Sequence, residues 1–249
     1  MKTLHDTGVL FGRLMRHILR SPDTIITVAI TPIAIMLLFV FVLGGAIETE
    51  GSYVNYLVPG ILLIAIASGI AYTALRLFAD VKNGLFERFQ SMPIKRTSLL
   101  WAHVLTSLVS NAVSMVLIIL VALAIGFRPS AGVLAWLAVA GILVLFTLAL
   151  TWLAVIAGLT ARSAEGSSAF SYPLVFLPFI SSAFVPTTTM PAAVRLFAEN
   201  QPVTSIVNTL RSLLGSQPVG SDIAIALAWC VAITVVAYLC AMRAYRRLG

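Results

Sequence analysis

The chain has 249 residues, of which 60 % are hydrophobic and only 10 % are charged, whereas a soluble globular protein carries roughly 45–50 % and about 25 %. Such a composition indicates that a lipid bilayer is the solvent, and it excludes intrinsic disorder, a collagen-like fold and a disulfide scaffold. The net charge of +7 would suit a nucleic-acid partner, but the positions of the charges along the chain argue against one.

Residues 1–22 are predicted to form an interfacial helix ahead of the first long apolar stretch. Apolar residues such as Leu10, Leu14 and Ile18 recur at helical spacing, while Arg13 and Arg20 lie on the other face. A helix packed on a soluble partner is the alternative. We favour the interface because the first apolar stretch begins only a few residues later, so the arginines would lie near anionic headgroups.

Six charge-free stretches are each long enough to cross about 30 Å of hydrocarbon, which takes roughly 20 residues of helix. The predicted fold class is therefore an all-α integral membrane protein. A secretory signal peptide is the alternative for the first stretch, but its apolar region would be shorter and a small-residue cleavage site would follow it. The six predicted spans cover approximately residues 24–47, 54–76, 100–126, 133–159, 168–186 and 223–242.

The basic residues predict the orientation of these spans. Thirteen of the 16 Lys and Arg residues fall in the N-terminal segment, the second and fourth connections and the C-terminal tail. The remaining three are Arg128, Arg195 and Arg211. Because cytoplasmic segments carry the excess of Lys and Arg, both termini are predicted to be cytoplasmic. The same asymmetry explains the pI near 9.9 and leaves nucleic acid without support.

The second connection, residues 80–96, is long for a chain with so few polar residues. Apolar side chains alternate there with a charged pair on a short run that is compatible with a helix, which is typical of a docking surface for a cytoplasmic partner. A positively charged anchor that packs on the chain's own helices explains the pattern equally well. The residues proposed for this surface are Gly84, Phe86, Glu87, Arg88, Phe89, Met92 and Pro93.

The predicted spans hold no Asp, Glu, Lys or Arg in their interiors, so a proton- or sodium-coupled carrier is not supported. His103 is expected to pack near the membrane interface. Small residues, including Gly69 and Gly158, would permit close approach of neighbouring helices. Proline residues are expected to kink the first and fifth spans, and the prolines concerned are Pro32, Pro173, Pro178 and Pro186.

Residues 187–222, the last extracytoplasmic connection, are predicted to contain two short amphipathic helices. One covers roughly 192–200, and the other begins at Pro202, which suits the first turn of a helix. Helices of this kind can dip into the outer leaflet without spanning it. They could gate an exit or only pack as a lid. The apolar stripe of the second helix comprises Val203, Ile206, Val207, Leu210, Leu213 and Leu214.

The sequence contains no phosphate-binding loop, because none of its three lysines follows a glycine. The spans also lack the clustered acids, histidines or metal ligands that a membrane enzyme needs. The chain is therefore predicted not to be an enzyme and to hold no cofactor and no metal. If it moves a solute uphill, another polypeptide supplies the energy.

Taken in order, these features resemble a known family. The interfacial helix, the six spans, the run Gly84-x-x-Glu87-Arg88-x-x-Ser91-x-Pro93 and the run Asn200-x-Pro202-Val-Thr204 followed by Leu210-Arg211 are similar to ABC type-2 export permeases. Within that family the chain looks like the daunorubicin-resistance-type drug exporters. The resemblance covers essentially the whole chain, although no single motif is as specific as a phosphate-binding loop.

The resemblance implies the membrane half of an ATP-driven exporter in the cell membrane of a bacterium or archaeon. Residues 80–96 would be the coupling segment seated in an ATP-binding-cassette ATPase subunit, which would hold ATP and Mg. A second permease copy, in a homodimer, and membrane lipid are the other partners. Residues implied as an extracytoplasmic gate are Pro202, Ile206, Leu210 and Arg211.

The cargo stays open between several alternatives. A hydrophobic drug-like or natural-product molecule is the leading hypothesis. Exporters of polysaccharides or lipid-linked glycans share the architecture, so a glycan is the second hypothesis. A membrane scaffold that transports nothing is the third.

Overall fold

The computed structural model describes residues 7–8, 10–12, 14–15, 22–47, 51–84 and 97–247. Every regular element in these residues is helical. In chain order the elements are α2 (Pro22–Leu38), η1 (Phe39–Leu43), α3 (Tyr53–Lys82), α5 (Thr97–Ala124), α6 (Val133–Thr160), α7 (Ala164–Ala169), α8 (Ser171–Phe176), η2 (Leu177–Ile180), η3 (Thr187–Thr189), α9 (Ala192–Asn200), α10 (Pro202–Leu214) and α11 (Asp222–Arg246).

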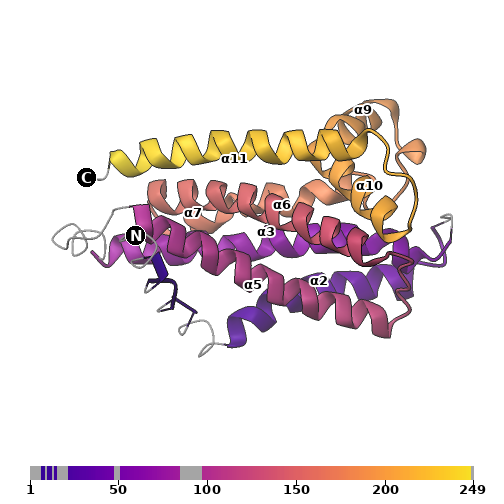
Figure 1. The fold of residues 1–249 in the computed structure, drawn as a ribbon, viewed down its shortest axis with the longest axis horizontal. Helices are drawn as coiled ribbons and strands as arrows, with labels where there is room; N and C mark the ends of the chain where they lie inside the picture. Colours follow the sequence, from indigo (N-terminus) through magenta and orange to yellow (C-terminus); the bar gives the residue numbers. More distant parts are fainter. Residues whose placement is uncertain are drawn as a thin grey trace.

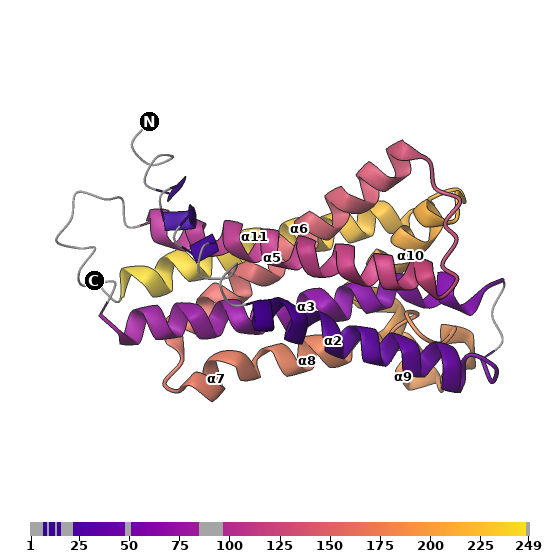
Figure 2. The same ribbon diagram turned by 90° about the horizontal axis from the view of Figure 1, so that it is seen from below.

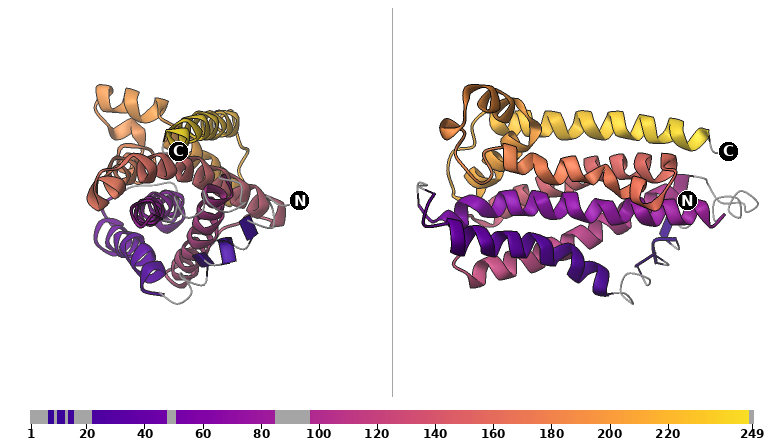
Figure 3. Two further views of the ribbon diagram at one scale, coloured as in Figure 1. Left: turned by 90° about the vertical axis from the view of Figure 1, so that its left-hand side faces the viewer. Right: turned by 180° about the vertical axis from the view of Figure 1, so that it is seen from behind.

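Helix α3 occupies the centre of the bundle. Viewed end-on, it is surrounded by α2, α5 and α6, and α11 lies outside α6 (Figure 3). Its most apolar stretch is 83 % buried, against 17 % for α11. A helix that is apolar on all sides is buried among other helices, whereas one that faces lipid can leave apolar side chains exposed. Hydropathy alone does not single out α3 as the central helix, because the mean hydropathy of its most apolar stretch is lower than that of α11.

Among the residues that the structure describes, four helices are long and apolar enough to cross a membrane, namely α3, α5, α6 and α11. Their residue ranges match the second, third, fourth and sixth predicted spans. The first predicted span corresponds to α2, which contains Pro32 and continues into the single π-helical turn η1. Within the described residues, this part of the chain gives only a shorter apolar helix, Val28–Leu43.

The fifth predicted span is broken into α7, α8 and the 3-10 turn η2, which follow one another along α3 (Figure 2). Pro173 lies in α8 and Pro178 lies at the start of η2. Since proline lacks an N–H group and its ring crowds the preceding turn, an uninterrupted α-helix through both positions would be strained. The interruption of this segment agrees with the expected effect of its prolines.

Two glycines allow neighbouring helices to approach closely. A Cβ atom on Gly158 of α6 would lie 2.8 Å from the carbonyl oxygen of Ala74 and 3.0 Å from Cβ of Leu77, both on α3. A Cβ atom on Gly69 of α3 would collide with the side-chain oxygen of Asn111 on α5. The prediction that small residues let these helices pack closely is confirmed at both positions.

The N-terminal residues that the structure describes contact the chain's own bundle. Leu10 is 7 % exposed and belongs to a hydrophobic cluster with Leu77 of α3 and Leu99 and Leu100 of α5, against which Phe11 also packs. Part of the apolar face predicted for residues 1–22 is therefore covered by protein.

The bundle has two ends that are formed by different elements (Figure 1). At one end, α3 finishes and α5 begins, and we call this the connection end. At the opposite end lie α9 and α10, and we call this the α10 end. Helices α3 and α5 run the whole distance between them, so each has residues at both ends.

Candidate functional site

The connection end carries the predicted coupling segment. Of its proposed residues the structure describes Gly84, whereas Phe86, Glu87, Arg88, Phe89, Met92 and Pro93 lie outside the described residues. Gly84 has φ = 68°, and its N–H donates to the carbonyl of Val81 at 3.2 Å. A glycine in the left-handed region just past a helix is a common way to end that helix. The chain thus leaves α3 at Gly84.

A side-chain contact within hydrogen-bond distance joins the two helices that flank this segment. Nε2 of His103 on α5 lies 3.0 Å from Oδ2 of Asp80 on α3, with side-chain exposures of 2 % and 19 %. Asp80 differs from the sequence-based expectation, because it belongs to the last turns of α3, which continues to Lys82, rather than to the connection. His103 is buried near the start of α5, and its place near the membrane interface stays a prediction.

At the α10 end, α10 begins at Pro202 as predicted, since a proline in the first turn has no N–H to leave unpaired. The preceding residue, Gln201, is 5 % exposed, and its side-chain amide donates to the carbonyls of Leu177 and Ile180. These bonds fix the start of α10 against η2.

The apolar stripe of α10 faces the bundle. Ile206 and Leu210 are fully buried and belong to the main hydrophobic core, and α10 packs on α11, α6 and α3. Pro202 is half-buried and lines a small apolar cavity of about 340 Å³ between α6, α8 and α11. Three of the four predicted gate residues therefore anchor α10 to the rest of the molecule.

Arg211, the fourth predicted gate residue, ties α10 to two other segments. Its guanidinium lies 3.7 Å from the centre of the Tyr56 ring on α3. Nη2 donates to the carbonyl of Ser182 at 2.8 Å and to that of Tyr56 at 3.2 Å, while Nε also donates to Tyr56 at 3.3 Å. Nη1 donates to Oδ1 of Asn208 at 3.2 Å. One side chain thus joins α10, the start of α3 and the turn after η2.

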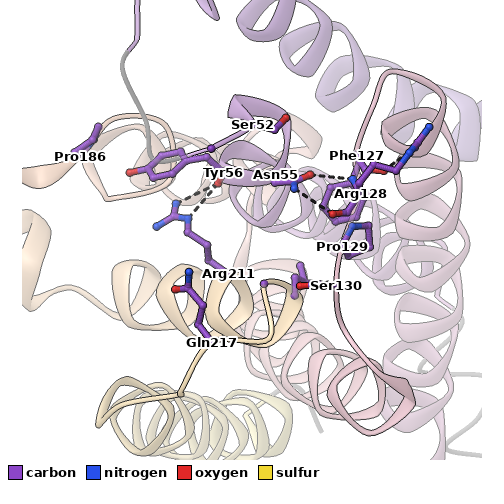
Figure 4. A pocket seen from close by; sticks show the side chains of 13 residues that line it. Ser52, Asn55, Tyr56, Phe127, Arg128, Pro129, Ser130, Pro186, Arg211 and Gln217 are labelled. Atoms are coloured by element: carbon purple, nitrogen blue, oxygen red, sulfur yellow. Dashed lines mark hydrogen bonds between the residues drawn. The ribbon is translucent and has the colours of Figure 1, made fainter.

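The same guanidinium lines a cavity of about 680 Å³ at the α10 end, which we call the Arg211 cavity (Figure 4). Its walls combine polar and apolar groups, and its lining residues are Gly51, Ser52, Asn55, Tyr56, Phe127, Arg128, Pro129, Ser130, Pro186, Arg211, Leu214, Gly215 and Gln217. Burial lowers the pKa of Arg211 from its ordinary value, but an arginine remains protonated at neutral pH. The cavity therefore contains a permanent positive charge.

Asn55 and Arg128 close one side of this cavity. The backbone N–H of Arg128 donates to Oδ1 of Asn55 at 2.9 Å, and Nδ2 of Asn55 donates to the carbonyl of Arg128 at 3.2 Å. The side chain of Arg128 folds back, with Nη1 donating to the carbonyls of Leu123 and Phe127 at 2.8 Å each. Arg128 thus places a cation close to the end of α5, where a positive charge is favourable.

With this geometry described, the family can be assigned. The profile of the ABC-2 type transporter family matches residues 5–214, which is most of the chain. The chain belongs to the ABC-2 type transporter family. The predicted resemblance to ABC type-2 permeases is therefore confirmed, and both the connection end and most of the α10 end fall inside the matched region.

Relatives of this ABC-2 family member align over nearly all of it. The daunorubicin resistance ABC transporter permease protein DrrB1 of Streptomyces coeruleorubidus is 26 % identical over 241 residues, covering 94 % of this chain and 83 % of the relative. The probable doxorubicin resistance ABC transporter permease protein DrrC of Mycobacterium tuberculosis is 27 % identical over 241 residues, covering 95 % and 86 %. These relatives are permease subunits of ABC transporters by name.

Sequence reasoning missed the partners of Arg211 and of His103. Ser182 contributes to the Arg211 contacts through its main-chain carbonyl, which leaves no sequence signal. Tyr56, an aromatic residue beside a predicted span end, offered a weak one. Asp80 had a stronger signal, because consecutive elements are usually adjacent in space, and Asp80 and His103 lie near the facing ends of consecutive predicted spans.

Proposed function

We propose that this chain is the membrane permease subunit of an ATP-driven exporter that moves a hydrophobic drug-like or natural-product molecule out of the cytoplasm. The observation that carries the proposal is the alignment of nearly the whole chain with permeases named for daunorubicin and doxorubicin resistance. A polysaccharide or lipid-linked glycan exporter remains the principal alternative, because the architecture does not select the cargo. A non-transporting scaffold is the other.

In this proposal the chain crosses the cell membrane six times. Helix α2 and η1 together make 22 residues, or about 33 Å at 1.5 Å per residue, which is enough for one crossing. The broken segment α7, α8 and η2 would supply the fifth. Helices α9 and α10 would form the extracytoplasmic re-entrant elements, with Pro202, Ile206, Leu210 and Arg211 as the gate.

Both termini would be cytoplasmic, which the distribution of basic residues supports. The expected result is that a cysteine introduced by Glu48→Cys reacts with a membrane-impermeant maleimide on intact cells. One introduced by Lys82→Cys should react only after the cells are opened. The background for both is a chain in which Cys230 and Cys240 are replaced by alanine. The opposite labelling pattern would reverse the topology.

ATP and Mg would be bound by a separate ATP-binding-cassette ATPase that docks on residues 80–96, the coupling segment. A second copy of this chain would complete the transport route, and lipid would surround the assembly. Large apolar side chains on α2 and α8 support such a contact between copies, because they are exposed in the single chain. Examples are Ile30 at 57 %, Tyr172 at 63 % and Phe176 at 62 %.

The transport experiment uses inside-out vesicles that contain the full chain and its cognate ATPase. We expect ATP-dependent accumulation of daunorubicin, followed by its fluorescence, and none with the chain alone or with an ATPase that cannot hydrolyse ATP. The double substitution Glu87→Arg and Arg88→Glu should abolish both accumulation and co-purification of the ATPase. ATP-driven movement of a lipid-linked glycan but no drug would favour the glycan exporter. Movement of neither would favour the scaffold.

A further inference from the structure

The charge of Arg211 has no acidic partner among the residues that the structure describes. The acceptors that it contacts are the carbonyls of Tyr56 and Ser182 and the amide oxygen of Asn208, all of which are neutral. These contacts use at most four of the five guanidinium N–H groups, so Nη1 retains one donor. Largely buried cations are normally paired with an anion, because removing a charge from water is costly.

The Arg211 cavity offers space for the missing anion. It holds about 680 Å³ beside the guanidinium, and the side chains of Ser52, Asn55 and Gln217 line it with hydroxyl and amide groups. Figure 4 shows Gln217 next to Arg211 and Asn55 on the far side of the same space. Phe127 and Leu214 add apolar surface. A ligand with a charged head and an apolar body would match both kinds of wall.

Arg128, the second arginine of the lining, does not supply this function. Its Nη1 group is bonded to the carbonyls of Leu123 and Phe127, and in Figure 4 its side chain extends away from Arg211. The cavity therefore has one guanidinium placed to bind an anion, and Arg211 is that group.

We propose that the Arg211 cavity binds the oxyanion of an amphipathic molecule, a phosphate or a carboxylate, with Arg211 donating a charge-assisted hydrogen bond to one anionic oxygen. Bonds between guanidinium and oxyanion groups are about twice as strong as neutral hydrogen bonds. The anion would offset the cost of burying the Arg211 charge. A membrane phospholipid and a transported molecule with an acidic group both carry this chemistry. The site does not depend on the proposed export function.

The test measures binding to the purified full-length chain in a neutral detergent. The probes are the short-chain anionic lipid dihexanoyl phosphatidylglycerol, its zwitterionic counterpart dihexanoyl phosphatidylcholine, decanoate and inorganic phosphate. We expect saturable 1:1 binding of phosphatidylglycerol and at least tenfold weaker binding of phosphatidylcholine. Competition by decanoate would assign the site to any acidic amphiphile. Competition by phosphate alone would assign it to a small anion and contradict the amphipathic ligand.

Two variants change the site by different routes. Arg211→Gln removes the cation and should weaken phosphatidylglycerol binding at least tenfold. Because that change also breaks the contacts of α10, Gln217→Glu provides a second variant that leaves Arg211 in place. Gln217 is exposed, so the new carboxylate should be tolerated and should neutralise the cavity from within. It should weaken binding to a similar extent.

The matched control is Arg195→Gln on α9, which makes the same change in net charge. Arg195 is exposed and already paired with Glu199 at 2.7 Å, so its loss should leave phosphatidylglycerol binding unchanged. If Arg195→Gln weakens phosphatidylglycerol binding as much as Arg211→Gln does, binding depends only on the net charge of the chain. That result would overturn the proposal. If phosphatidylglycerol binds only after Glu48→Gln and Glu50→Gln, the anion paired with Arg211 is a carboxylate of the chain itself. That result would also overturn the proposal.

Discussion

The close contact between α6 and α3 at Gly158 predicts that two alanine substitutions on α6 differ strongly in their effect on stability. In Gly158→Ala the new methyl group would lie 2.8 Å from the carbonyl oxygen of Ala74 and 3.0 Å from Cβ of Leu77. Neither atom is the end of a flexible side chain, so α3 and α6 must separate. Overpacking of this kind costs about 1–3 kcal/mol.

Gly141→Ala is the matched control. Gly141 lies in α6 as well, but a Cβ atom there would meet nothing within 4 Å. Both substitutions share the gain in helix propensity, about 1 kcal/mol, so the difference between them isolates the overpacking cost. We therefore expect Gly158→Ala to be less stable than Gly141→Ala by about 1–3 kcal/mol.

Thermal unfolding of both variants in one detergent, followed by tryptophan fluorescence, would measure the difference. In a chain of this length each kcal/mol corresponds to roughly 2–4 °C in melting temperature. Gly158→Val should melt lower still, because it adds two more methyl groups at the same contact. Equal melting temperatures for Gly158→Ala and Gly141→Ala would show that α3 and α6 are not packed as closely as described.

Two further predictions concern the side-chain contacts of Asp80 and of Glu199. His103→Leu should destabilise the chain by about 1–3 kcal/mol, because it leaves Asp80 without its partner, and adding Asp80→Asn should cost less than the sum of the single changes in a double-mutant cycle. The hydrogen bond from Arg195 lowers the pKa of the Glu199 carboxyl in the folded chain. The contact therefore contributes fully to the stability of α9 above the ordinary pKa of a carboxyl group, and this contribution is lost as the pH falls through the lowered pKa. Helicity of α9 measured by NMR across that range should show an acid transition that Glu199→Gln removes, and a transition that persists in the variant would contradict the assignment.

The sequence predicted the elements that depend on apolar pattern. Length and hydropathy located α3, α5, α6 and α11, and the stripe through Ile206 and Leu210 identified the buried face of α10. These features follow from local composition, because lipid and protein interior both select apolar side chains over a whole turn of helix. The effects of Gly158 and of the prolines in the fifth span were predictable for the same reason.

Features that depend on one residue's neighbours in space were not predicted. The end of α3 is an example. The second span was predicted to end near residue 76, and the structure adds that α3 continues to Lys82, with Asp80 on its last turns in contact with His103 of α5. The contacts of Arg211 are another, because its acceptors are mostly carbonyls from separate segments. The sequence shows that Arg211 is a charged residue within an apolar stripe, but it does not show which groups surround its guanidinium.

Helix α3 is joined at three levels to α5 and to the residues that directly follow α5, and this limits how the molecule can respond to force at the connection. Asp80 and His103 pair at the connection end, Asn111 packs against Gly69 in the middle, and Asn55 exchanges two hydrogen bonds with Arg128 at the α10 end. Sliding one helix past the other would break all three sets of contacts. A load applied through residues 85–96 is therefore expected to move the pair as one body, with displacement taken up where α3 meets α2, α7 and α8. Since Tyr56 on α3 carries the ring and the carbonyl that hold Arg211, such a displacement would reach the Arg211 cavity directly.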